Sequence, residues 1–192
     1  MKHLSIPTLA LAAGLALVTA ACSNNADTAD SDASATTTPA GDATVTPGPV
    51  AATDSHAAQF LGDAIKGDNS EIKLGQLAAE KGSSDAVKTF GQMLVTDHGK
   101  AKDEAGKIAT AMNVPIPTET KPEADAEYAK LQGMTGAAFD KEFASFMVDD
   151  HKKAIAMFEQ EAASSDPAQV TALATKTLPT LKAHLAKAQS LQ

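Results

Sequence analysis

The sequence predicts an all-α protein: a ferritin-like four-helix bundle with a long middle connection, preceded by a disordered N-terminal tether. Between residues 56 and 192, apolar side chains recur every three or four positions, which is the spacing of one face of a helix. No alternating apolar run of strand length occurs there, and β-branched residues are sparse. The segment also has the size of one domain, so we predict a single bundle over residues 56–192.

The first 21 residues have the layout of an export signal. Lys2 supplies a positive charge, residues 4–18 form an apolar stretch, and Thr19-Ala20-Ala21 provides small residues for cleavage. The apolar stretch is too short to serve as a membrane span. We therefore predict a signal peptide over residues 1–21 and an exported protein.

Cys22 is the only cysteine and directly follows the predicted cleavage site. Residues 19–22 resemble the lipobox of bacterial lipoproteins, which implies a lipidated Cys22 and a membrane anchor. Ser23 resembles the sorting pattern for the outer membrane, with the protein facing the periplasm. Ordinary secretion into the periplasm is the alternative. In both cases a single cysteine forms no internal disulfide, so the fold has to depend on burial.

Residues 22–55 differ in composition from the rest of the chain. They consist mostly of Ala, Thr, Asp, Ser, Gly and Pro, and contain no aromatic residue and no Leu, Ile or Met. Such a segment buries too little apolar surface to offset the entropy lost on ordering. We predict a disordered tether that holds the bundle away from a membrane.

Caps and breakers set the expected helix boundaries. Gly82 ends the first helix, Asn113 with Pro115 ends the second, and Asp166 caps the fourth, with Pro167 at its first position. Pro179 is expected to kink the fourth helix. The four expected helices cover about 55–81, 84–112, 137–163 and 167–191, with a short extra helix at about 124–132.

The connection over about residues 114–136 is longer than a usual link between helices. It can cross the length of the bundle and place the third helix parallel to the second, as in ferritin-like proteins. A short up-and-down bundle with a decorated loop is the alternative.

An Asp-His dipeptide occurs at the same place in two similar stretches, residues 90–105 and 143–158. When Asp97-His98 is aligned with Asp150-His151, the surrounding apolar positions also coincide. Both histidines lie on stripes that are expected to face the core. A titratable ring is therefore predicted at the same depth of two helices.

Four candidate site residues come from the four long helices. Glu71 lies about 12 residues before the first turn, and His98 lies about 15 residues after it. His151 lies about 15 residues before the last turn, and His184 lies about 18 residues after it. Since antiparallel neighbours meet at equal distances from their shared turn, these side chains are expected to lie within about one helical turn of each other. They are Glu71, His98, His151 and His184, with Asp97 and Asp150 expected at the edge of the cluster.

Two explanations fit such a cluster. Neutral imidazoles and a carboxylate can bind one transition-metal ion, with Zn, Fe or Cu as candidates. Alternatively, each histidine pairs with an aspartate of a neighbouring helix in a polar network that fixes the register. A di-iron centre is not expected, because the chain contains no Glu-x-x-His motif.

The chain contains an ordered series of motifs: Leu74-Gly75-x-Leu77-Ala78, Phe90-Gly91-x-Met93, Asp97-His98, Phe139-Asp140, Asp150-His151, Leu178-Pro179 and His184. Together these motifs resemble those of a family of bacterial envelope proteins, the domain-of-unknown-function 4142 group. The resemblance implies a ferritin-like helical fold, export, and importance of the two Asp-His pairs, but no established activity.

Composition argues against several classes of function. The formal charge is −8 and all 16 basic residues are lysines, so no nucleic-acid partner is expected. The bundle contains no phosphate-binding loop and no nucleophile motif, so an enzyme is not expected. We expect a non-enzymatic envelope lipoprotein whose bundle acts as an interaction or stress-related module with an internal His/Asp network. The alternative is a metal-binding or redox bundle that uses His and Glu ligands.

Overall fold

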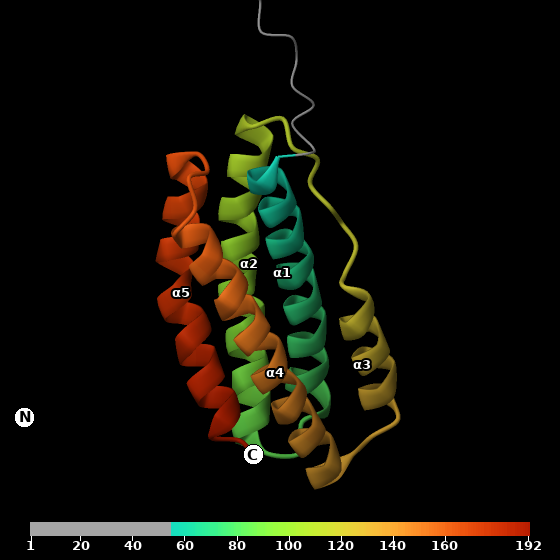
Figure 1. The fold of residues 1–192 in the computed structure, drawn as a ribbon. Coiled ribbons are helices and arrows are strands. Elements are labelled where there is room, and N and C mark those ends of the chain that lie inside the picture. Colours follow the sequence, from blue (N-terminus) through green and yellow to red (C-terminus); the bar gives the residue numbers. More distant parts are fainter. Residues whose placement is uncertain (1–54) are drawn as a thin grey trace, which may run out of the picture. The chain divides into compact units, whose positions relative to one another are not determined.

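Five α-helices and no strand make up residues 55–192, the part of the chain that the computed structural model describes (Figure 1). This confirms the prediction of an all-helical bundle. The predicted signal peptide, Cys22 and the predicted tether up to residue 54 lie outside the described residues. The helices are α1 (His56–Lys81), α2 (Asp85–Ala111), α3 (Pro122–Gln132), α4 (Gly136–Ala162) and α5 (Ala168–Gln189).

Serine caps define the first two helix starts. The Ser55 side chain accepts a hydrogen bond from the Ala58 N–H at 3.1 Å, and the Ser84 side chain accepts one from the Val87 N–H at 3.2 Å. Each cap satisfies an amide that has no partner within its helix. At its far end α2 stops where Asn113 takes a positive φ of 57°. The expected bounds therefore agree with the structure within two residues for all five helices.

The cap of α5 differs from the expectation. Pro167 occupies the N-cap position, α5 begins at Ala168, and no side chain caps its free amides. The Asp166 carboxylate instead accepts a hydrogen bond from the His56 ring at 2.7 Å. This carboxylate is therefore engaged by a distant histidine and not by the free amides of α5. The helix continues through Pro179, and the kink there stays a prediction.

The helices form two antiparallel pairs, α1 with α2 and α4 with α5. Between the pairs, the connection that contains α3 runs back along the bundle (Figure 1). The helix α4 therefore starts at the end where α1 turns into α2, and it runs in the same direction as α2. Asp140, in the first turns of α4, accepts hydrogen bonds from the N–H groups of Ser83 and Ser84 at 2.7 and 2.8 Å, which ties α4 to that turn.

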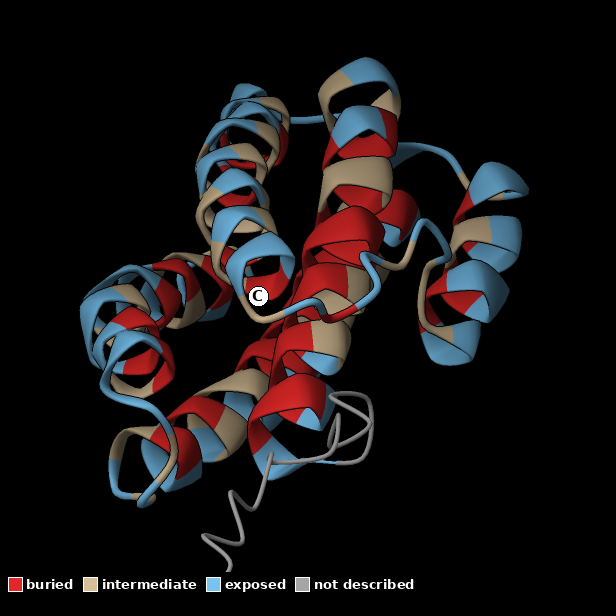
Figure 2. Cartoon of the chain, turned by 90° about the horizontal axis from the view of Figure 1, so that it is seen from above, coloured by how far each residue is buried: buried red, intermediate tan, exposed pale blue. Residues whose placement is uncertain are grey.

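The core consists of two apolar clusters separated by a polar level. One cluster includes Phe60, Ile65 and Phe158, and the other includes Leu74 and Phe90. Seen from above, buried residues lie on the sides of the long helices that face one another (Figure 2). Each long helix passes from one cluster to the other, and on the way it contributes buried polar residues: Asp68, Asn69, Ser70 and Glu71 on α1, His98 on α2, Asp150 and His151 on α4, and His184 on α5.

Two glycines let α1 and α2 approach closely. A Cβ atom on Gly91 would lie 2.5 Å from the Gly75 carbonyl oxygen and 2.7 Å from the Ala79 nitrogen. A Cβ atom on Gly75 would lie 2.8 Å from the Gly91 carbonyl oxygen. The backbones therefore touch at a point where no larger residue fits.

Within the described residues, no helix has the length and hydropathy required to cross a bilayer.

Candidate metal centre

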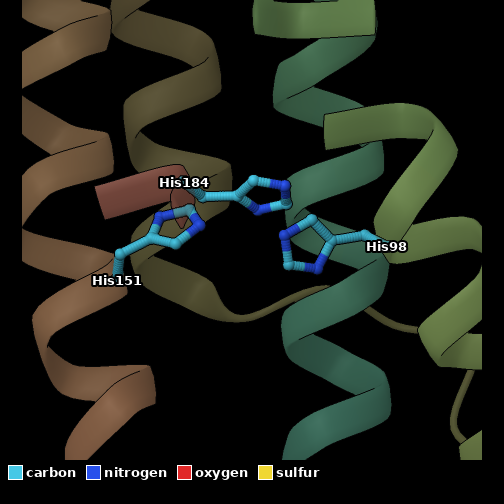
Figure 3. A group of neighbouring side chains, drawn as sticks. All are labelled: His98, His151 and His184. Atoms are coloured by element: carbon cyan, nitrogen blue, oxygen red, sulfur yellow. The ribbon is translucent and has the colours of Figure 1, made fainter. Parts of the chain in front are cut away.

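Three imidazole rings from three helices meet inside the bundle, as the sequence predicted. The ring centroids of His98, His151 and His184 lie 5.3 to 5.9 Å apart, and the residues are 5%, 0% and 1% exposed. Figure 3 shows the rings turned toward one another, each with one nitrogen on the inner side of the group. One nitrogen from each ring lies within 4.8 Å of the others.

The other nitrogen of each ring faces an acceptor. His98 Nδ1 lies 2.8 Å from an Asp68 carboxylate oxygen, and His151 Nδ1 lies 3.0 Å from the Met147 carbonyl oxygen. His184 Nε2 lies 3.3 Å from an Asp97 carboxylate oxygen. Because an ionised carboxylate or a carbonyl only accepts, the proton of each neutral ring is on the nitrogen that faces it. The opposite nitrogen then carries a lone pair.

Those opposite nitrogens have no hydrogen-bond partner among the described residues. They are His98 Nε2, His151 Nε2 and His184 Nδ1, and each is buried. The buried Glu71 Oε2 is also without a partner. This oxygen lies 4.0 Å from His98 Nε2, and Glu71 Oε1 lies 3.4 Å from His151 Nδ1. The cluster therefore presents three nitrogens and one oxygen that no hydrogen bond within residues 55–192 satisfies.

Burial keeps two of the rings neutral. It lowers the pKa of His184 to about 4, together with repulsion from the His98 and His151 rings, and it also lowers the pKa of His151. Burial disfavours the charged form of His98 too, but the Glu71 and Asp68 carboxyls outweigh this effect and raise its pKa. A neutral imidazole is the form that binds a metal ion.

The carboxyl groups of α1 also respond to burial. It raises the pKa of Glu71 well above its usual value, and the nearby Asp150 carboxyl raises it further. It raises the pKa of Asp68, although the hydrogen bond from His98 works in the opposite direction. A cation at the centre would reverse this effect on Glu71, because it stabilises the ionised carboxylate.

The spacing of the donors is close to that of a metal site. A tetrahedral ion with bonds of about 2.0–2.1 Å to nitrogen holds its donors about 3.3 Å apart. One nitrogen from each ring lies within 4.8 Å of the others, so the side chains would have to move closer together to hold an ion. Each ring is also fixed through its second nitrogen by a carboxylate or a carbonyl, as metal-binding histidines usually are.

The structure therefore brings together all four candidate residues, but it gives the two aspartates different places. Asp97 lies at the edge and pairs with His184 rather than with its neighbour His98. Asp150 is buried next to Glu71 and has no hydrogen bond to a ring. Asp68 was not among the predicted site residues, although it lies three residues before Glu71 and so on the same face of α1.

A second group of titratable residues, also missed, lies at the other end of α1. His56 Nδ1 is 2.7 Å from Asp166 Oδ2 and 3.2 Å from Glu161 Oε2. The His56 side chain is half exposed, whereas that of Glu161 is fully buried. This group ties the start of α1 to the segment that joins α4 and α5.

Together these features define the protein as an all-helical bundle with a buried cluster of three histidines and a glutamate. Its sequence matches the family model described as "Domain of unknown function (DUF4142)" over residues 43–191, and the chain belongs to this family. The resemblance noted in the motifs is thereby confirmed.

A solved structure shares the fold. The crystal structure of a DUF305 fragment from Deinococcus radiodurans superposes with a TM-score of 0.63 and 15% sequence identity, covering 70% of this chain and 93% of that one. No curated protein matches the sequence. At this identity the structural likeness concerns the fold alone.

Proposed function

We propose that this protein binds one transition-metal ion in the centre of its bundle, through His98, His151, His184 and Glu71. One observation carries the proposal: one nitrogen from each of three buried rings lies within 4.8 Å of the others, and the inner nitrogen of each ring and Glu71 Oε2 have no hydrogen-bond partner among the described residues. A buried polar atom left without a hydrogen bond costs about 1–3 kcal/mol. A single cation would satisfy all four atoms at once.

A polar network without metal accounts for only part of this arrangement. The His98–Asp68 and His184–Asp97 pairs support such a network, because each joins two helices. Each pair, however, uses the nitrogen on the outer side of its ring and leaves the inner one free. The pairs are better explained as supports that orient the rings toward an ion.

The donor set favours a borderline metal. Imidazole nitrogen suits Zn, Fe and Cu, and one carboxylate completes a four-coordinate shell. Three neutral rings and one carboxylate leave a divalent ion with a net positive charge, which Asp68 and Asp97 balance from outside the donor shell. A single ion fits better than two, since the chain lacks the paired Glu-x-x-His motifs of di-iron bundles.

We also propose that the bundle is ferritin-like and works in the bacterial envelope as a lipoprotein that holds or senses metal. The parallel course of α2 and α4 supports the first part (Figure 1). The export signal and the Cys22 lipobox in the sequence support the second. No chemical step is required of such a protein beyond binding.

Metal analysis of protein purified without a nickel column tests the proposal. We expect about one equivalent of Zn, Fe or Cu per chain, or a raised melting temperature when one of these ions is added to metal-free protein. Binding at 100 times the dissociation constant stabilises the fold by about 2.7 kcal/mol. Less than a tenth of an equivalent, with unchanged melting after addition of each ion, would contradict it.

A double variant and a matched control locate the ion. His98→Asn with His151→Asn should abolish the metal-induced rise in melting temperature. His56→Asn removes a histidine from the far end of α1 and should leave that rise intact. A rise of equal size in the double variant would place the metal elsewhere.

A further inference from the structure

A small cavity of about 20 Å³ lies directly beside the cluster. It is large enough for about one water molecule. Its polar lining contains four carboxylates, one lysine and one of the proposed metal ligands on α2: Asp63, Asp68, Glu71, Asp150, Lys121 and His98. Two atoms of this lining, Glu71 Oε2 and His98 Nε2, are buried donors without a partner.

Three of the α1 residues that line the cavity lie on one face of the helix. Asp63, Gly67 and Glu71 are four residues apart and so share this face. Asp63 is exposed, Gly67 is partly buried and Glu71 is buried. Carboxylates thus lie on both sides of Gly67, which has no side chain of its own.

The side chain of Lys121 lies over Gly67. A Cβ atom on Gly67 would be 3.3 Å from Lys121 Nζ and 3.6 Å from Lys121 Cε. The backbone N–H of Lys121 donates to Ser70 Oγ at 2.9 Å, which fixes the residue against α1. Glycine at position 67 therefore provides the room that the lysine side chain uses.

The ammonium group is held there without a close ion pair. Among residues 55–192, no carboxylate oxygen lies within 4.0 Å of Lys121 Nζ, whereas Lys66 on the same helix pairs with Glu119 at 3.3 Å. The Lys121 side chain can leave this position at small cost, because no salt bridge has to be broken. Lys121 is thus a cation of the protein that lies among carboxylates. The same carboxylates would attract a metal cation.

We propose that this cavity is the route by which a divalent metal cation reaches the centre, and that the Lys121 ammonium controls it by occupying the entrance. This inference rests on the proposed metal binding, and it adds the route by which the metal cation enters the site. Asp63 attracts the hydrated ion, Lys121 moves aside, and Asp68 and Asp150 line the way to Glu71 and His98.

A second hollow near the cluster is a poorer route. It is lined by Asp97 on α2 and Lys176 and Thr177 on α5, among others. None of the four proposed ligands lines it. Its two lysines, Lys100 and Lys176, also pair with Asp97 and Glu104, so its charges are largely neutralised.

Stopped-flow mixing of the metal-free mature chain with Co²⁺ tests this route, since the visible absorption of Co²⁺ reports binding. Lys121→Gln should raise the association rate about threefold to tenfold, because it removes a like charge from the path. Lys121→Met should give the same result. Asp63→Asn should lower the rate by about threefold and weaken its dependence on salt.

Matched controls carry the same charge changes away from the cavity. Lys66→Gln removes a lysine of α1 that lies outside the cavity, and Asp103→Asn removes an exposed carboxylate of α2. Both should change the rate less than twofold. Equal rates for Lys121→Gln, Lys121→Met and Lys66→Gln, with Co²⁺ still bound at equilibrium, would overturn the route alone. Absence of Co²⁺ binding to every variant and to the parent would overturn the proposed function and the route with it.

Discussion

At the residue scale, the proposed metal binding depends on histidine rings in which one nitrogen faces a hydrogen-bond acceptor and the other nitrogen has no partner among the described residues. Asp68, Asp97 and the Met147 carbonyl each occupy one nitrogen of a ring. The acceptor fixes the tautomer and the orientation of the ring, and leaves a lone pair on the inner side. Three such rings and Glu71 are held close together without an ion, which would reduce the cost of organising the proposed site.

The low pKa of His184 predicts how acid affects the metal-free protein. Burial and the facing rings of His98 and His151 lower its pKa to about 4, against the pull of Asp97. The unfolded ring takes up a proton near pH 6.5, whereas the folded ring stays neutral down to about pH 4. Protons therefore bind preferentially to the unfolded chain in this window, and His184 lowers stability by roughly 3 kcal/mol as the pH falls through it.

His184→Asn removes that titration. The parent should be the more stable protein at pH 7, and the difference in free energy of unfolding should narrow as the pH falls from 6.5 to 4. Urea denaturation of both metal-free proteins at several pH values measures it. A difference that stays constant over the window would show that the ring is not held neutral.

The sequence could predict the four donors but not their supports. Glu71, His98, His151 and His184 follow from helical periodicity and from equal distances to shared turns, and both are regular. The pairing of Asp97 with His184 depends on which way a side chain at the edge of the cluster turns. The position of Lys121 depends on the path of an irregular connection, for which periodicity gives no information.

At the element scale, each long helix delivers one donor, so the distance between helices sets the size of the site. A close approach occurs at Gly75 and Gly91, where the backbones of α1 and α2 touch. Glu71 lies one turn before Gly75, and His98 lies two turns after Gly91. The glycine contact therefore fixes how far apart these two donors are.

Gly91→Ala tests this dependence. The added methyl group has no room, so α1 and α2 must separate, and we expect a loss of about 1–3 kcal/mol in the free energy of unfolding. Metal affinity should fall by about tenfold or more as Glu71 and His98 move apart. Thermal melting and metal titration of the variant measure the two effects.

Gly99→Ala is the matched control on the same helix. A Cβ atom there would meet no atom within 4 Å. Alanine should therefore stabilise α2 by up to about 1 kcal/mol through its higher helix propensity. If both substitutions changed stability by the same amount and sign, the close contact would not be the cause.

Helix boundaries were predictable where local chemistry decides them. Ser55, Ser84 and Asn113 act within a few residues of themselves, and the structure places the ends there. The cap of α5 was mispredicted: Asp166 bonds to His56, which lies 110 residues away in the sequence, and Pro167 occupies the N-cap position. No pattern near Asp166 indicates that partner.

At the scale of the whole bundle, the polar level lies between two apolar clusters, and a separate ion pair closes one end. The hydrogen bond to Asp166 raises the pKa of His56, and the Glu161 carboxylate contributes to the same effect. A raised pKa in the folded state means that protonation stabilises the fold. This contribution is complete below about pH 6.5 and is lost as the pH rises through the folded-state pKa.

His56→Gln should reveal this end contact as a pH-dependent loss. The parent should exceed the variant in stability most clearly near pH 5.5, and the difference should shrink toward pH 8.5. Parallel thermal melts across this range measure it. A difference that grows with rising pH would contradict the assigned ion pair.

The central claim is that three imidazoles and one carboxylate inside the bundle hold a single metal ion. X-ray absorption at the zinc edge of the Zn²⁺-loaded protein tests it most directly, because the spectrum reports the donors themselves. We predict three imidazole nitrogens and one oxygen at about 2.0–2.2 Å, and loss of this shell in the His98→Asn, His151→Asn variant. A shell of oxygens alone, or the same spectrum from the variant, would contradict it.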